Sequence, residues 1–248
     1  MISFFNTILS PYLIMVYLGM AAALLTLYLN LAGAGYEKRL RLKLVAALII
    51  SVLAGWCFAN LGNWFTGRLI GLPLQTMIRN AGFSWYPGLL GGVLAYFLII
   101  LLMKQNIREV MNLTAPGLPL GHALGRIGCA IAGCCYGAET DFLLFGIHFS
   151  RIPTQLAEAA FGIVLFLLLQ FVIKKRRPSV YAYSYAVFRF IIEFFRADNR
   201  GTFIPGIPGS PAQQIAVIFV IVTTIVILAL HVWDKHKADI LRRSDYEK

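Results

Sequence analysis

Long apolar stretches with few charges constrain this chain more than any other feature of its sequence. Hydrophobic residues make up 59% of its 248 residues and charged residues only 13%, and its mean hydropathy is +0.74. These values lie far outside the range of a soluble globular domain. A helix of about 20 apolar residues is long enough to cross the roughly 30 Å of hydrocarbon in a bilayer. The sequence therefore predicts an all-α integral membrane protein.

Seven stretches are predicted to be transmembrane helices. They lie near residues 12–33, 43–65, 82–103, 117–137, 153–173, 179–196 and 212–233. The fourth is the weakest by hydropathy because it is rich in glycine and contains His122 and Arg126, but small residues allow close helix packing in lipid. No polar linker, low-complexity tract or repeat divides the chain, so residues 1–248 are predicted to form a single polytopic domain.

The distribution of basic residues favours seven spans. With that number, 15 of the 22 lysines and arginines fall on one side: Lys38, Arg39, Arg41, Lys43, Lys104, Arg108, Lys174, Lys175, Arg176, Arg177, Lys235, Lys237, Arg242, Arg243 and Lys248. Positive charge marks the cytoplasmic side, which predicts an N-terminus outside and a cytoplasmic C-terminus. The net charge of +11 is then explained by topology and anionic lipid head groups, so no nucleic-acid partner is expected.

Two arginines inside predicted spans indicate where the functional site lies. Arg126 and Arg189 are each about ten residues from the cytoplasmic start of their spans, which at a rise of about 1.5 Å per residue places both near mid-depth. Ionisable groups at that depth are costly and usually mark a function.

A polar stripe accompanies the second arginine. Tyr185, Arg189, Glu193 and Arg196 are spaced so that they fall within an arc of roughly 80° on one helix face. Other polar residues share the outer half of the predicted bundle, namely Gln155, Glu158, Gln213 and Gln214. Together these residues predict a polar cavity that opens toward the outer leaflet.

An excess of arginine over carboxylate in such a cavity indicates an anionic ligand. The guanidinium group matches the geometry of phosphate and stays charged at any accessible pH, so a phospholipid head group is the expected ligand. The alternative is a purely structural lock, in which Arg189 pairs with Glu193 and Arg126 pairs with Glu158 to hold the helices together.

Three segments resemble one known family. "GRIGCAIAGCCYG" (125–137), "PTQLAE" (153–158) and "YAVFRFIIEFFR" (185–196) are similar to segments of prolipoprotein diacylglyceryl transferase, a multi-pass enzyme of the bacterial plasma membrane. The resemblance implies transfer of diacylglycerol from phosphatidylglycerol to the lipobox cysteine in the signal-peptide region of exported prolipoproteins. It implies no cofactor and no metal.

The resemblance also implies roles for individual residues. Arg126, Arg189 and Glu193 would be catalytic. The substrate-binding residues would be Arg196, Tyr185, Gln155, Glu158, Tyr86, Cys129, Cys134 and Gln214.

The chain departs from the family pattern at several positions. Asparagine is expected where Cys129 and Ala132 stand, glutamate at Cys134, and the family's candidate histidine base at Tyr86. His148 is a possible replacement for that base. Two rival functions follow from these departures: a related lipid transferase with a different acceptor, and a lipid-binding or transport protein without catalysis.

The cysteines near Arg126 allow several interpretations. The spacing Cys-x4-Cys-Cys of Cys129, Cys134 and Cys135 is not a recognised zinc spacing. On a continuous helix Cys129 and Cys134 would lie about 140° apart, so their thiols are not expected to meet. The thiols are interpreted either as small packing groups or as a reactive site in which Cys134 has a lowered pKa.

Overall fold

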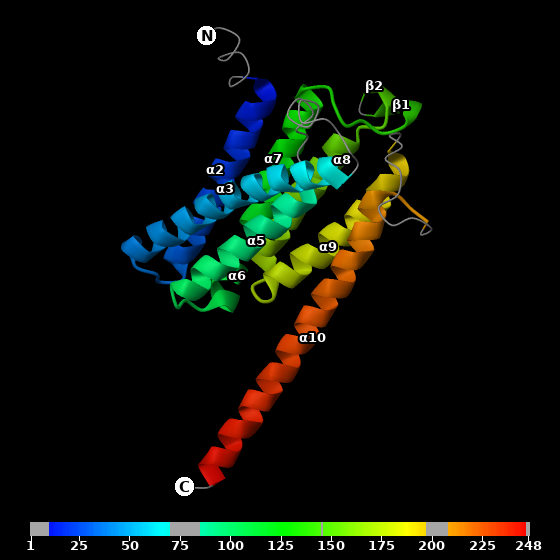
Figure 1. The fold of residues 1–248 in the computed structure, drawn as a ribbon. Coiled ribbons are helices and arrows are strands. Elements are labelled where there is room, and N and C mark those ends of the chain that lie inside the picture. Colours follow the sequence, from blue (N-terminus) through cyan, green and yellow to red (C-terminus); the bar gives the residue numbers. More distant parts are fainter. Residues whose placement is uncertain (1–9, 70–84, 145, 197–207, 247–248) are drawn as a thin grey trace. The chain divides into compact units, whose positions relative to one another are not determined.

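The structure is a computed structural model that describes residues 10–69, 85–144, 146–196 and 208–246 (Figure 1). Most of these residues are helical, as predicted. The helices are α2 (Pro11–Gly33), α3 (Lys38–Leu69), α5 (Trp85–Leu102), α6 (Ile107–Thr114), α7 (Gly117–Ile131), α8 (Thr154–Leu167), α9 (Arg177–Ile192) and α10 (Pro211–Tyr246). A π-helical turn at Leu168–Val172 extends α8, and a 3-10 turn at Glu193–Phe195 extends α9.

A short antiparallel hairpin corrects the all-α prediction. It consists of β1 (Glu139–Leu144) and β2 (Ile147–Arg151), with Leu143 opposite His148. Apolar and polar residues alternate along β2, and Gly146 adopts a φ of +79° that allows the chain to turn.

Four helical segments within the described ranges are long and apolar enough to cross a membrane. They are Pro11–Gly33, Lys38–Gly62, Thr154–Val172 and Pro211–Ala229. By contrast, α7 has 15 residues, which corresponds to a length of about 22 Å and is shorter than the hydrocarbon layer. The chain is therefore a helical membrane protein, whereas the seven spans, their orientation and the single domain remain predictions.

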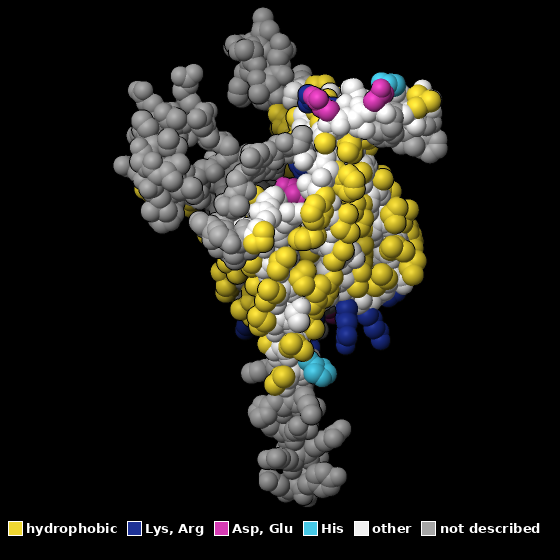
Figure 2. Space-filling model, turned by 90° about the vertical axis from the view of Figure 1, so that its right-hand side faces the viewer, with side chains coloured by type: hydrophobic (Ala, Val, Ile, Leu, Met, Phe, Trp, Pro, Cys, Tyr) yellow, Lys and Arg dark blue, Asp and Glu magenta, His cyan; other side chains and the backbone are white. Residues whose placement is uncertain are grey.

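The outward faces of these helices are apolar. Val164, Phe171, Val187 and Ile225 are each more than half exposed, which is typical of side chains that contact lipid. On the face shown in Figure 2, hydrophobic side chains form a broad band. In this view, lysine and arginine side chains and a histidine lie below the band, and acidic, basic and histidine side chains lie above it. The hairpin precedes the start of α8 and the sequence Lys-Lys-Arg-Arg follows its π-helical end, so the two ends of α8 differ in charge.

The chain divides into two compact units, of which unit 2 comprises Ala21–Gly117. Its helices α3 and α5 meet at glycines: a Cβ on Gly55 would lie 2.7 Å from the carbonyl oxygen of Gly88, so the two backbones touch. A buried cluster of Leu27, Leu31, Leu44, Ala47, Tyr96, Ile100 and Val110 forms its core. The hydroxyl of Tyr96 is satisfied there by Thr114 at 2.9 Å.

Unit 1 comprises Met1–Met20 and Leu118–Lys248 and contains most of the predicted site. Helices α7 and α8 approach closely, since a Cβ on Gly162 would lie 2.8 Å from the carbonyl oxygen of Pro119. The hairpin segment joins the end of α9 through a hydrogen bond of 2.8 Å from the amide of Ala138 to the carbonyl of Phe195. These contacts bring α7, α8 and the end of α9 together around the site.

The start of α10 is fixed by a reciprocal cap. Ser210 Oγ accepts from the amide of Gln213 at 3.3 Å, and Gln213 Oε1 accepts from the amide of Ser210 at 3.0 Å. Pro211 occupies the first helical position, where its missing N–H costs nothing. The cap therefore holds Ser210 in one position beside the end of α9.

Candidate active site

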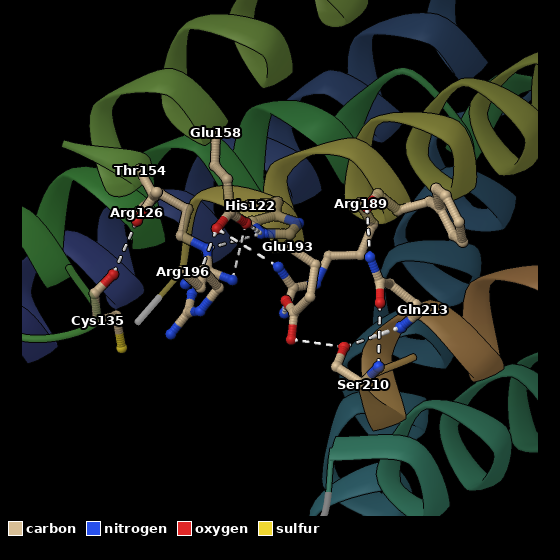
Figure 3. Close-up of polar contacts among 11 residues, drawn as sticks. His122, Arg126, Cys135, Thr154, Glu158, Arg189, Glu193, Arg196, Ser210 and Gln213 are labelled. Atoms are coloured by element: carbon tan, nitrogen blue, oxygen red, sulfur yellow. Dashed lines mark hydrogen bonds and ion pairs between the residues drawn. The ribbon is translucent and has the colours of Figure 1, made fainter. Parts of the chain in front are cut away.

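A single buried carboxylate, Glu158 in α8, lies at the centre of the site (Figure 3). Its side chain is 1% exposed and contacts three guanidinium groups. Arg126 Nη2 of α7 lies 2.8 Å from Glu158 Oε2, while Arg189 Nη1 and Arg196 Nη1 lie 3.9 Å and 3.8 Å from Glu158 Oε1. Both ion pairs of the structural-lock alternative, Arg126–Glu158 and Arg189–Glu193, are present in this geometry.

A second carboxylate orients Arg189. Glu193 Oε2 lies 2.8 Å from Nη2 of Arg189, which precedes Glu193 by four residues, or about one helical turn. The hydroxyl of Ser210 donates to Glu193 Oε1 at 2.9 Å. Ser210 was not among the predicted site residues, because only the fold of α10 against α9 brings it there. The two contacts, Ser210 to Glu193 and Glu193 to Arg189, together fix the direction of the Arg189 guanidinium group.

His122 is a further residue that the sequence did not assign to the site. Arg126 Nε donates a hydrogen bond of 3.1 Å to His122 Nε2, which places the lone pair on Nε2 and the proton of a neutral imidazole on Nδ1. The ring of His122 also packs against Tyr185, with centroids 5.1 Å apart. The spacing of four residues between His122 and Arg126 on α7 is the signal that could have found this pair.

Among the described residues, ion pairs join the guanidinium groups of Arg126, Arg189 and Arg196 to two carboxylates, Glu158 and Glu193. Arg189 Nη1 is buried and has no hydrogen-bond acceptor within the described residues. A buried donor without an acceptor is costly, and an anion placed beside it would remove that cost.

A small, mostly apolar pocket adjoins the cluster. It lies among α7, α8 and α9, and Glu158, His122 and Tyr185 are its polar lining residues together with Tyr181. Phe161, Leu165 and Phe188 form much of the remaining wall.

Other predicted binding residues lie elsewhere or have structural partners. Gln155 donates through Nε2 to the carbonyl oxygen of Cys134 at 2.5 Å, so its amide holds a loop. Gln214 donates to the carbonyl of Gly209 at 3.4 Å at the start of α10. Tyr86 is the second residue of α5 in unit 2, and its side chain lies outside the described residues.

The cysteines depart most from the sequence-based expectation. Helix α7 ends at Ile131, and Gly133 and Cys135 have φ values of +68° and +65°, so Cys134 is not on a continuous helix with Cys129. The Sγ atoms of Cys129, Cys134 and Cys135 all lie within 4.8 Å of one another. The hypothesis that Cys134 is a reactive thiol stays a prediction.

His148, the possible replacement base, lies on the exposed hairpin. Its Nε2 pairs with Asp141 Oδ1 at 2.5 Å, and both side chains are largely exposed. His122, by contrast, contacts both Arg126 and Glu158 of the cluster.

The fold and this site define a helical membrane protein with a buried arginine–carboxylate cluster beside an apolar pocket. Comparison with known proteins gives the family. The sequence profile of prolipoprotein diacylglyceryl transferase matches residues 1–230. The chain belongs to the prolipoprotein diacylglyceryl transferase family, whose members are named as transferases.

Individual relatives agree with this assignment. The chain is 33% identical over 204 residues to phosphatidylglycerol–prolipoprotein diacylglyceryl transferase 2 of Clostridium perfringens, which covers 76% of this chain and 79% of that protein. It is 29% identical over 206 residues to the transferase of Clostridium tetani, covering 75% and 80% of the two chains. The match to the transferase of Pseudoalteromonas translucida is 40% identical over 133 residues but covers only 49% of this chain and 50% of that protein.

Proposed function

We propose that this chain transfers diacylglycerol from phosphatidylglycerol to the thiol of the lipobox cysteine in the signal-peptide region of prolipoproteins. The names of its relatives specify this donor and a prolipoprotein acceptor. The structural observation that carries the proposal is the convergence of Arg126, Arg189 and Arg196 on Glu158, together with the buried Arg189 Nη1, which has no hydrogen-bond acceptor among the described residues.

The reaction exchanges a carbon–oxygen bond for a carbon–sulfur bond. The acceptor sulfur attacks the glycerol carbon that carries the phosphate ester, and the electron pair of the broken bond stays on the phosphate oxygen. Glycerol phosphate leaves, and the proton lost by the thiol ends on the phosphate product. Negative charge therefore grows on the leaving group during the reaction, and a preorganised guanidinium stabilises that transition state.

The three arginines have different parts in this proposal. Arg126 and Arg189 bind the phosphate oxygens of the lipid, and Arg196 contributes to the same positive field. Glu158 and Glu193 fix the positions of the guanidinium groups, since each carboxylate lies less than 3 Å from one of them.

We place the site toward the outer face of the bacterial plasma membrane, where exported prolipoproteins emerge. The membrane topology that we propose has seven spans in a single domain, an N-terminus outside and a cytoplasmic C-terminus. It is supported by the asymmetric distribution of basic residues and by the long apolar helices.

The decisive experiment is a turnover assay with the purified protein in phosphatidylglycerol vesicles. Addition of a lipobox peptide is expected to release glycerol phosphate and to add one diacylglyceryl group to the peptide mass. A peptide with serine in place of cysteine is the acceptor control. Binding of phosphatidylglycerol without release of glycerol phosphate would contradict the proposal and favour a non-catalytic lipid-binding protein.

A further inference from the structure

Three thiols outside the arginine cluster form a compact group at the end of α7. The Sγ atoms of Cys129, Cys134 and Cys135 lie within 4.8 Å of one another, although one of them belongs to the helix and two to the loop that follows. The loop turns back on the helix, because the amide of Cys134 donates to the carbonyl of Cys129 at 3.1 Å. The left-handed conformations of Gly133 and Cys135 make that reversal possible.

The loop that carries two of these thiols is held by buried side chains of α8. The hydroxyl of Thr154 donates to the carbonyl of Cys135 at 3.0 Å, a contact visible in Figure 3. The amide of Gln155 donates in the same way to the carbonyl of Cys134. Thr154 and Gln155 are 0% and 1% exposed. The backbone positions of Cys134 and Cys135 are therefore fixed through their carbonyl groups, while Cys134 Sγ donates weakly to the carbonyl of Cys129 at 3.7 Å.

The spacing of the sulfur atoms matches the coordination of a small cation. With metal–sulfur bonds of about 2.3 Å, the sulfur atoms of a tetrahedral zinc site lie about 3.8 Å apart. Atoms already within 4.8 Å reach that separation by small rotations of the side chains. Cys134 is exposed, so water can reach the fourth coordination position.

The charge of the surroundings suits a divalent ion. Three thiolates and one divalent cation carry a net charge of −1. The guanidinium group of Arg126 interacts electrostatically with Cys129, so a positive group lies beside this net negative charge. Sulfur ligands without oxygen donors select soft or borderline metals over Mg²⁺ or Ca²⁺.

We propose that Cys129, Cys134 and Cys135 form a binding site for one thiophilic divalent cation of the Zn²⁺ type. The family pattern has asparagine and glutamate where Cys129 and Cys134 stand, so this site belongs to the present chain rather than to the transferase reaction. It departs from the expectation of no metal, which rested on a cysteine spacing that is not a recognised zinc spacing, because the loop after α7 brings the three sulfur atoms together. The site does not depend on the proposed transfer activity, and its test measures metal binding alone.

The first test is titration of the reduced, metal-free, full-length protein in detergent with Co²⁺ under anaerobic conditions. Co²⁺ takes the place of Zn²⁺ and gives an absorption band when thiolates coordinate it. We expect one equivalent to bind and each of Cys129→Ser, Cys134→Ser and Cys135→Ser to weaken binding at least tenfold. Cys57→Ser is the matched control, because Cys57 lies in α3 of unit 2, and it should leave binding unchanged.

The second test uses the unmodified protein, so it does not depend on whether a variant folds. Zn²⁺ should protect three of the four cysteines from alkylation by N-ethylmaleimide, with Cys57 still labelled at its unprotected rate. Absence of a thiolate–cobalt band together with equal labelling of all four cysteines would overturn the proposal. A disulfide within the group that, once reduced, yields protein without metal uptake would overturn it as well.

Discussion

Arg126 and Glu158 join α7 to α8 through an ion pair of 2.8 Å whose carboxylate is 1% exposed. The same carboxylate lies within 4 Å of Arg189 and Arg196, so one acidic group serves three basic ones. The pairs Arg126–Glu158 and Arg189–Glu193 are those of a structural lock, whereas the contacts of Arg189 and Arg196 with Glu158 go beyond it. Turnover of arginine variants distinguishes a binding site from such a lock.

Replacing either phosphate-binding arginine by lysine should abolish turnover while the protein stays folded. Arg126→Lys and Arg189→Lys keep the charge but lose the planar fork that binds two oxygens at once. By comparison with the loss of one oxyanion donor, turnover should fall about 10²–10³-fold. Release of glycerol phosphate measures the effect, and Arg151→Lys on the exposed hairpin is the matched control. Near-normal activity in both variants would support the structural lock.

Removing the charge of Glu158 should destabilise the protein. In Glu158→Gln, three buried guanidinium groups lose their shared counter-charge, a change that typically costs about 3–5 kcal/mol. Thermal unfolding in detergent should show a lower midpoint, and an anionic phospholipid should raise that midpoint more than a zwitterionic one. Glu139→Gln is the control, because the pair of Glu139 with Arg151 is exposed and contributes little. An unchanged midpoint in Glu158→Gln would contradict the central role of this carboxylate.

Ser210 is expected to act through Glu193. Ser210→Ala removes both the helix cap of α10 and the hydrogen bond to Glu193 Oε1. Arg189 then loses part of its support, so kcat should fall about tenfold, equivalent to about 1.4 kcal/mol, with little change in KM. Ser210→Thr retains the hydroxyl and should restore activity. Equal losses in the alanine and threonine variants would show that the hydroxyl is not responsible.

The contact between α7 and α8 should not tolerate a side chain at Gly162. A Cβ there would lie 2.8 Å from the carbonyl oxygen of Pro119, so Gly162→Ala should separate the helices and cost about 1–3 kcal/mol. Gly125→Ala in α7 is the paired control, since a Cβ at Gly125 meets no described atom within 4 Å. The free energy of unfolding should fall for the first variant and stay equal or rise for the second.

The predicted topology can be tested directly. Reporter fusions at residues 2 and 248 should report opposite sides of the membrane, with the C-terminal reporter in the cytoplasm. The Lys-Lys-Arg-Arg run at residues 174–177 should be cytoplasmic by the same method. Two reporters on the same side would remove a span and place α7 outside the lipid.

The sequence predicted those parts of the site that depend on helical spacing. Arg189 and Glu193 are one turn apart, and helix geometry alone brings their side chains together. The pairing of Arg126 with Glu158 was predicted as part of the structural lock, and the structure contains that pair.

The sequence did not predict the parts that depend on where helices end. The thiols of Cys129 and Cys134 meet because α7 stops at Ile131, and a periodicity argument assumes that it continues. Ser210 reaches Glu193 only through the packing of α10 on α9, which spacing along one helix cannot reveal. The short helix α6 and the hairpin were missed because neither is long or apolar enough to give a strong pattern.

The order of the charged residues along the chain also bears on how the protein enters the membrane during synthesis. Arg126, Glu158, Arg189, Glu193 and Arg196 alternate in sign from the first to the last. As translation proceeds, the summed charge of these five residues therefore changes between one and zero and never reaches two. Because each uncompensated charge in lipid is costly, this order keeps the insertion cost of every partly synthesised chain close to that of a single arginine.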